Sequence, residues 1–130
     1  MHFSGLILAA LACMAPTLAK VYEVTVNDQG FQPSKLCLQP GDSVQWNFVA
    51  GGHSVEETDK ADSCTSKGTW SSTTMMQGWQ WNRTFRTPGV VWYMSSTGQD
   101  CARGFKGAIY VGGQCPATSS QASTPTPPPY

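Results

Sequence analysis

Short segments of alternating apolar and polar residues, separated by glycine and proline, constrain this chain more than any other feature of its sequence. In Ser43–Phe48 the alternation is strict, which is the period of a β-strand with one buried face. No helix signal is longer than a turn or two, and the best candidate lies between Thr58 and Trp70. About seven short strands with such punctuation predict an all-β sandwich. The other strand-like segments are residues 21–26, 35–38, 79–85, 90–94 and 106–111.

An immunoglobulin-like sandwich is the structural alternative. Such domains place two core cysteines around a core tryptophan, with a tyrosine two residues before the second cysteine. Cys37 and Cys101 could take the cysteine positions, but the residue two before Cys101 is Gln99. The sequence therefore fits this alternative poorly.

A short apolar segment near the N-terminus predicts where the protein matures. Residues 6–15 are mostly apolar and are followed by Pro16 and by small residues before Lys20, an order typical of a secretory signal peptide. The segment has about half the length needed to cross a bilayer. We therefore predict a signal peptide over residues 1–19 and a secreted protein, with the cell wall as one candidate destination. A membrane partner is not expected.

The rest of the chain is expected to form a folded domain over residues 20–116 and a disordered Ser/Thr/Pro-rich tail over residues 117–130, which suits an O-glycosylated spacer. Eight basic and eight acidic side chains give a formal net charge of zero, and no two basic residues are adjacent. Nucleic acid, which needs concentrated positive charge, is therefore excluded as a partner.

Four cysteines follow the predicted signal peptide, an even number in a chain bound for an oxidising compartment. Zinc is the alternative, but zinc sites usually contain closely spaced pairs of ligands, whereas these cysteines are widely spaced. Two disulfides are therefore expected among Cys37, Cys64, Cys101 and Cys115.

Four segments in order resemble the cupredoxins, above all the phytocyanin-like and fungal secreted members of that family. They are an opening motif at residues 31–46 (FQPSKLCLQPGDSVQW), the segment of the first copper histidine at 51–55 (GGHSV), the approach to the copper cysteine at 84–93 (TFRTPGVVWY) and the closing strand at 104–111 (GFKGAIYV). The resemblance implies a cupredoxin-like Greek-key β-sandwich of about seven to eight strands. It also implies the disulfides Cys64–Cys101 and Cys37–Cys115.

The same resemblance implies that the copper site is degenerate. In the family a cysteine, a short loop, a histidine and a methionine or glutamine follow the aromatic strand. Met94 is aligned with the copper cysteine, Asp100 with the second histidine and Phe105 with the axial ligand, and the loop is one residue longer than in phytocyanins. A blue-copper centre needs two imidazoles and a thiolate, yet His53 is the one histidine after the signal peptide. No cofactor is therefore expected, with copper the one candidate.

Weaker metal sites remain as alternatives. His53 with Met75, Met76 and Met94 would form a soft cuprous site, and His53 with Asp100 would bind a divalent ion weakly. Against these, His53 can simply fill a hydrogen-bonding position, and Met94 can fill the space of the missing metal.

Five tryptophans suggest an aromatic binding surface, with Trp70, Trp79 and Trp81 as candidates for stacking on sugar rings or anchoring a protein partner. Core packing is the alternative for at least two of the three. The sequon at Asn82 predicts N-glycosylation. It would place Asn82 at the surface and turn Trp79 and Trp81 inward.

No Ser/His/Asp set exists beyond His53, so an enzyme is not expected. The sequence therefore predicts a non-redox extracellular or cell-wall protein with a binding or structural role. Its partner would be an extracellular protein or a carbohydrate. The alternative is a copper-binding or electron-transfer cupredoxin with an atypical His/Met site.

Overall fold

The structure is a computed structural model that describes residues 18–113 and 115–116. Most of the expected signal peptide, residues 1–17, and the whole expected tail, residues 117–130, lie outside the described residues. The described part contains nine strands, whereas seven to eight were expected. These are β1 (Val21–Asn27), β2 (Gly30–Gln32), β3 (Lys35–Leu38), β4 (Ser43–Phe48), β5 (Glu56–Thr58), β6 (Ser66–Ser71), β7 (Gln80–Thr84), β8 (Gly89–Met94) and β9 (Lys106–Val111).

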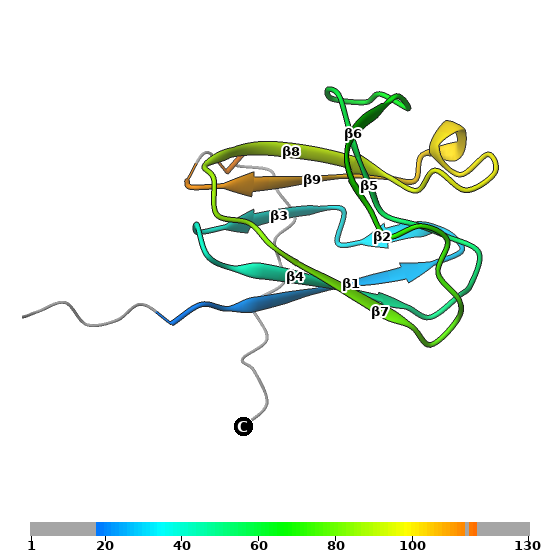
Figure 1. Cartoon of the computed structure of the whole chain (residues 1–130), viewed down its shortest axis with the longest axis horizontal. Helices are drawn as coiled ribbons and strands as arrows, with labels where there is room; N and C mark the ends of the chain where they lie inside the picture. The colour runs from blue at the N-terminus through cyan, green and yellow to red at the C-terminus, as the bar shows by residue number, and fades with distance from the viewer. Residues whose placement is uncertain (1–17, 114, 117–130) are drawn as a thin grey trace, which may run out of the picture.

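The strands form two mixed sheets that pack face to face, as the sequence predicts (Figure 1). One sheet has the order β2-β1-β4-β7 and the other the order β3-β9-β8-β5-β6. Strands β1 and β4 are parallel, as are β3 and β9, and the other neighbours are antiparallel. The sandwich therefore mixes both kinds of pairing within each sheet.

The core lies between the sheets and follows the predicted alternation. In β4, Val44, Trp46 and Phe48 are at most 1% exposed, while the residues between them face outward. Val24 and Val26 of β1 have no exposed surface. Each such side chain contributes roughly 1.5–3 kcal/mol through burial, so the inward faces of the two strands hold the sheets together.

The expectation of a helical turn between Thr58 and Trp70 is wrong. This segment reverses direction near Asp62, which has a φ of 56°, and continues as β6, which pairs with β5 across a register shift. The helix found in the described part of the chain is a single 3-10 turn over Cys101–Arg103. No helix within residues 18–113 and 115–116 is long and apolar enough to cross a membrane.

Two disulfides join distant strands, in the pairs that the family resemblance implied. Cys37 and Cys115 have Cα atoms 5.6 Å apart, because β3 and β9 run side by side. Cys64 and Cys101 have Cα atoms 5.8 Å apart, and their bond ties the segment before β6 to the 3-10 turn. Such bonds indicate an oxidising environment.

Candidate functional site

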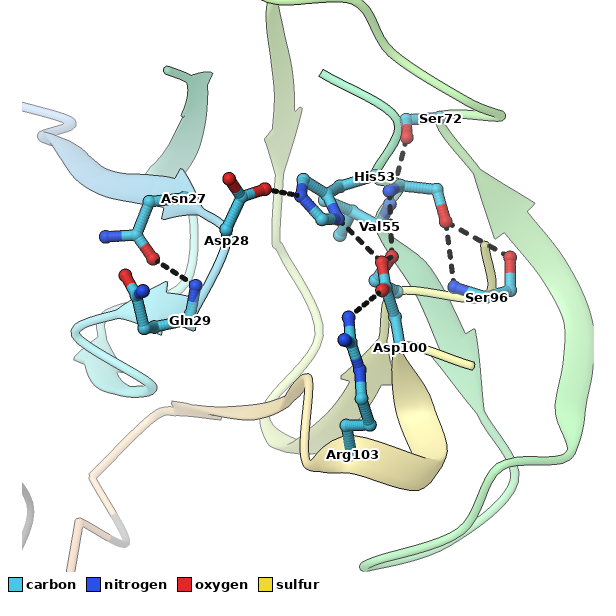
Figure 2. A network of polar contacts seen from close by, with 11 residues as sticks. Asn27, Asp28, Gln29, His53, Val55, Ser72, Ser96, Asp100 and Arg103 are labelled. Atoms are coloured by element: carbon cyan, nitrogen blue, oxygen red, sulfur yellow. Dashed lines mark hydrogen bonds and ion pairs between the residues drawn. The ribbon is translucent and has the colours of Figure 1, made fainter. Parts of the chain in front are cut away.

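One end of the sandwich gathers polar side chains from four separate segments (Figure 2). His53 lies in the loop after β4 and forms an isolated bridge with Met75. Asp28 belongs to the tight turn between β1 and β2, and Ser95 follows β8 directly. Asp100 precedes the 3-10 turn as its N-cap residue. The strand ends therefore bring these four residues to one place.

The imidazole of His53 is held between two carboxylates. Its Nδ1 lies 2.6 Å from Asp100 Oδ2 and its Nε2 lies 2.9 Å from Asp28 Oδ1. The side chains of His53 and Asp100 are each 7% exposed, whereas that of Asp28 is 75% exposed. Because an ionised carboxylate can only accept hydrogen bonds, both ring nitrogens must donate. His53 is therefore an imidazolium in this arrangement.

Asp100 is the centre of this network, because both of its oxygens accept hydrogen bonds. Ser95 Oγ donates to Oδ2 at 2.7 Å, and Arg103 Nη2 donates to Oδ1 at 2.9 Å. Ser95 Oγ accepts in turn from the backbone N–H of Ser54 at 3.0 Å. One buried carboxylate thus bonds to two cations and a hydroxyl, which offsets the cost of burying its charge.

The two buried ionisable groups stabilise each other's charged form. Burial lowers the pKa of His53, but the hydrogen bonds and charges of Asp100 and Asp28 outweigh it and raise that pKa above its usual value. Burial raises the pKa of Asp100, but the hydrogen bonds from His53, Ser95 and Arg103 and the charge of His53 lower it overall. Each of the two groups therefore favours the charged form of the other, as in an ion pair.

Phe105 covers one face of the imidazole. Its ring stacks on His53 with the centroids 4.8 Å apart and the planes at 22°, and only 2% of Phe105 is exposed. Arg103 also lies near the phenyl ring, with its Cζ atom 5.9 Å from the ring centroid. This stacking closes the site from the side that the family comparison assigned to an axial ligand.

The residue that the family resemblance aligns with the copper cysteine, Met94, lies directly before a residue of the network. Met94 is the last residue of β8, one position after the core residue Tyr93, and the side chain that donates to Asp100 is that of the next residue, Ser95. Moving the alignment by one residue to Ser95 also removes the extra residue from the loop. Met75 meets His53 through a backbone bridge, and Met76 is exposed. None of these three methionines therefore bonds to the network.

The donor set does not fit a type 1 copper ion. It offers one imidazole with both nitrogens bonded to carboxylates, together with a hydroxyl and a carboxylate in place of the soft thiolate and second imidazole that such a site needs. The four cysteines at 37, 64, 101 and 115 are all paired. Residues 18–113 and 115–116 contain no group of three or more His, Cys, Asp or Glu arranged to hold a metal ion.

The three candidate tryptophans have different environments. Trp70 and Trp81 are partly buried against the core and stack on each other with centroids 5.6 Å apart, while Arg83 Cζ lies 4.9 Å from the Trp70 ring centroid. Trp79 precedes β7 and is 52% exposed. The expectation that Trp79 points inward is therefore wrong, because β7 begins one residue later. Asn82 is exposed within β7.

Three residues of the network were not singled out from the sequence. In the sequence, Asp28 lies in a polar segment typical of a turn, Ser95 follows the residue aligned with the copper cysteine, and Arg103 is an isolated charge. One signal was available in the sequence. The loop after β8 is one residue longer than in phytocyanins when Met94 is aligned with the copper cysteine, and this extra residue indicates Ser95 as the aligned residue instead.

Comparisons with known proteins identify the fold. No family model and no curated protein matches the chain. A purple cupredoxin from Nitrosopumilus maritimus has a TM-score of 0.59 at 17% identity, over 69% of this chain and 98% of its own. A pseudoazurin from Sinorhizobium meliltoi has a TM-score of 0.56 at 25% identity, over 75% and 76%. A mutant amicyanin in its reduced Cu(I) form has a TM-score of 0.56 at 18% identity, over 73% and 85%. The chain thus has the cupredoxin fold.

Proposed function

We propose that this protein is a secreted, non-redox member of the cupredoxin fold with a binding or structural role outside the cell. The observation that carries the proposal is the pair of carboxylates on His53, at 2.6 and 2.9 Å from its two ring nitrogens. An imidazole that donates from both nitrogens has no lone pair left for a metal. The ion network would therefore fill the end of the sandwich where related structures hold copper.

The absence of a thiolate supports the same proposal. A blue centre depends on a cysteine sulfur as its soft ligand, whereas the network contains the hydroxyl of Ser95, which already bonds to Asp100 and Ser54. A hydroxyl in such a position is a hard, neutral donor that does not favour copper. Electron transfer through this end is therefore not part of the proposed role.

We also propose that the protein is not an enzyme. His53 is the one histidine among the described residues, and as an imidazolium bonded to two carboxylates it cannot accept a proton from a nucleophile. Ser95 donates its proton to Asp100 rather than to His53, so the three residues do not form a nucleophile-activating triad. The two disulfides support a place outside the cell, where oxidising conditions preserve them.

The test is copper loading of the purified secreted protein. We expect far less than one copper per chain after separate incubation with Cu(I) and Cu(II) at neutral pH and removal of unbound metal, with no intense visible absorption. The matched control is His53→Gln, which should retain no less copper than the unmodified protein. Stoichiometric copper that is lost in His53→Gln would instead establish the alternative, a copper protein with an atypical site.

A further inference from the structure

An open groove lies beside Trp79, and none of the residues that line it belongs to the His53 network. It has a volume of about 370 Å³ and is lined by residues 47–49 and 77–80. Trp79 is 52% and Val49 is 53% exposed. No Lys, Arg, Asp or Glu lines the groove. An aromatic ring is therefore presented to solvent in a shallow, uncharged setting.

Backbone contacts fix the position of the tryptophan. The N–H of Phe48 donates to Trp79 O at 2.9 Å, and the N–H of Gly78 donates back to Phe48 O at 2.7 Å. Gly51 packs so closely that a Cβ atom there would lie 2.8 Å from the backbone nitrogen of Gln77. The groove is thus built on the end of β4 and held in shape before any ligand arrives, which lowers the cost of binding.

The groove continues onto the outward face of the β2-β1-β4-β7 sheet. Because β-strand side chains alternate, the residues between the buried positions of these strands point outward together. Register places them in two rows across the strands. Five of these seven residues are carboxamides and only one, Glu23, is charged. The rows are Gln32, Thr25, Asn47 and Gln80, then Glu23, Gln45 and Asn82.

The polar groups nearest to Trp79 are available. Within the described part of the chain, the carboxamides of Gln77 and Gln80 make no hydrogen bond to the protein. Asn47 differs, since it accepts from Gln45 at 2.8 Å and donates to Glu23 at 3.2 Å. A free carboxamide both donates and accepts, as a sugar hydroxyl does. An indole face offers the apolar surface on which the C–H face of a pyranose ring stacks.

From this combination we infer that the Trp79 groove and the adjoining sheet face bind a neutral polysaccharide. The lack of charge around the groove argues against an anionic polymer, which would need Lys or Arg. A protein partner would need a contact of roughly 800 Å² on each side, and it is tested below as the competing occupant. The inference goes beyond the proposed function, because saccharide binding here does not depend on whether the His53 end holds copper.

The test measures retention of the secreted protein on insoluble neutral polysaccharides, namely cellulose, chitin and a β-1,3-glucan, with immobilised polygalacturonate as the charged comparison. We expect retention on at least one neutral polymer and little on the charged one. Trp79→Ala should weaken binding about tenfold or more, because it removes the indole face on which the sugar ring stacks. Trp92→Ala, which removes a half-buried tryptophan from the other sheet, should bind as the unmodified protein does.

A second variant changes the shape of the groove without touching its side chains. Gly51→Ala should also weaken binding, since its added methyl group must push the loop away from Gln77. Denaturant unfolding of each variant shows whether it is folded. The inference fails if no neutral polymer retains the protein, if Trp79→Ala binds equally well, or if Trp79 mediates binding to a protein but not to a saccharide. Copper content, measured separately, does not enter these outcomes.

The expected glycan at Asn82 provides a further check, because Asn82 lies in the second row of the same face. Retention is therefore measured before and after enzymatic removal of N-glycans. Binding in both forms supports an external saccharide as the ligand. Binding only after removal would show that the glycan of the protein itself covers this face, which would overturn the inference.

Discussion

The His53 network and the Trp79 groove differ in what their polar groups bond to. At the first, every side-chain group of His53, Asp100 and Ser95 has a partner within the protein, and Phe105 stacks on the remaining ring face. At the second, two carboxamides near an exposed indole have no such partner among the residues that the structure describes. A histidine and a tryptophan were both plausible binding residues in the sequence.

The difference shows that the residue type is a weaker guide to function than the use of its hydrogen-bonding capacity. A buried group whose donors and acceptors are all used within the chain contributes to stability and specificity of packing. An exposed group whose capacity is unused can exchange water for a ligand. This comparison can be tested by replacing residues of the His53 network with metal ligands, and by measuring how much the residues of each region contribute to stability.

The largest expected effect is the gain of a copper–thiolate centre in the double variant Ser95→Cys/Asp100→His. The change supplies the missing thiolate and second imidazole and removes the carboxylate that occupies His53 Nδ1. We expect tight copper binding with the intense visible absorption of thiolate coordination, recorded by titration with Cu(II).

The matched control is Met94→Cys/Asp100→His, which places the same chemical groups one residue earlier on β8. It should remain without that absorption, because a shift of one residue in a strand turns the side chain to the other face. Colour in the control and none in the Ser95 variant would show that Met94, and not Ser95, occupies the cysteine position.

Much of the fold was predictable, because a strand with one buried face has apolar and polar residues in alternation along its sequence. Strands β1 and β4 alternate in this way and were recognised. Strands β2 and β5 have only three residues each, too few to show a period. Strand β6 is exposed at every position except Trp70, so no buried face marked it, and a helical turn was expected in this segment instead.

The second largest effect is the loss of stability in Asp100→Ala. Removing this carboxylate leaves His53 and Arg103 without their shared partner, and breaking a buried ion pair in this way costs about 3–5 kcal/mol. The free energy of unfolding from urea titration measures it. Asp28→Asn is the control, because the Asp28 side chain is 75% exposed and an exposed pair contributes about 1 kcal/mol or less. Equal losses in both variants would contradict the central place of Asp100.

The site was less predictable than the fold, because its contacts join residues that are far apart in sequence. Asp28 and His53 are 25 positions apart and His53 and Asp100 are 47 apart, and no local pattern encodes such a pairing. The family resemblance placed His53, Asp100 and Phe105 together, since it aligns each of them with a ligand of the family's copper site. It could not show that His53 and Asp100 bond directly to each other.

A smaller effect separates the two tryptophans that flank Gln80. Trp81→Ala should reduce the free energy of unfolding by about 2 kcal/mol, less than the 3–5 kcal/mol of a fully buried tryptophan, because Trp81 is only partly buried and stacks on Trp70. Trp79→Ala should change it by no more than about 0.5 kcal/mol. Urea titration of both variants measures these free energies of unfolding. A large decrease for Trp79→Ala would show that Trp79 belongs to the core rather than to a binding surface.

The smallest effect is the pH dependence of stability. The pKa of His53 is raised above 6.5 in the folded protein, so its contribution is complete below pH 6.5 and is lost as the pH rises through the folded value. The pKa of Asp100 is lowered below 3.8, so its contribution is present above pH 3.8 and is lost as the pH falls through the folded value. The network should therefore stabilise the protein most in mildly acidic solution. Urea midpoints across this range should decline toward alkaline pH in the unmodified protein but not in His53→Gln, and an unchanged decline in that variant would show that other groups control it.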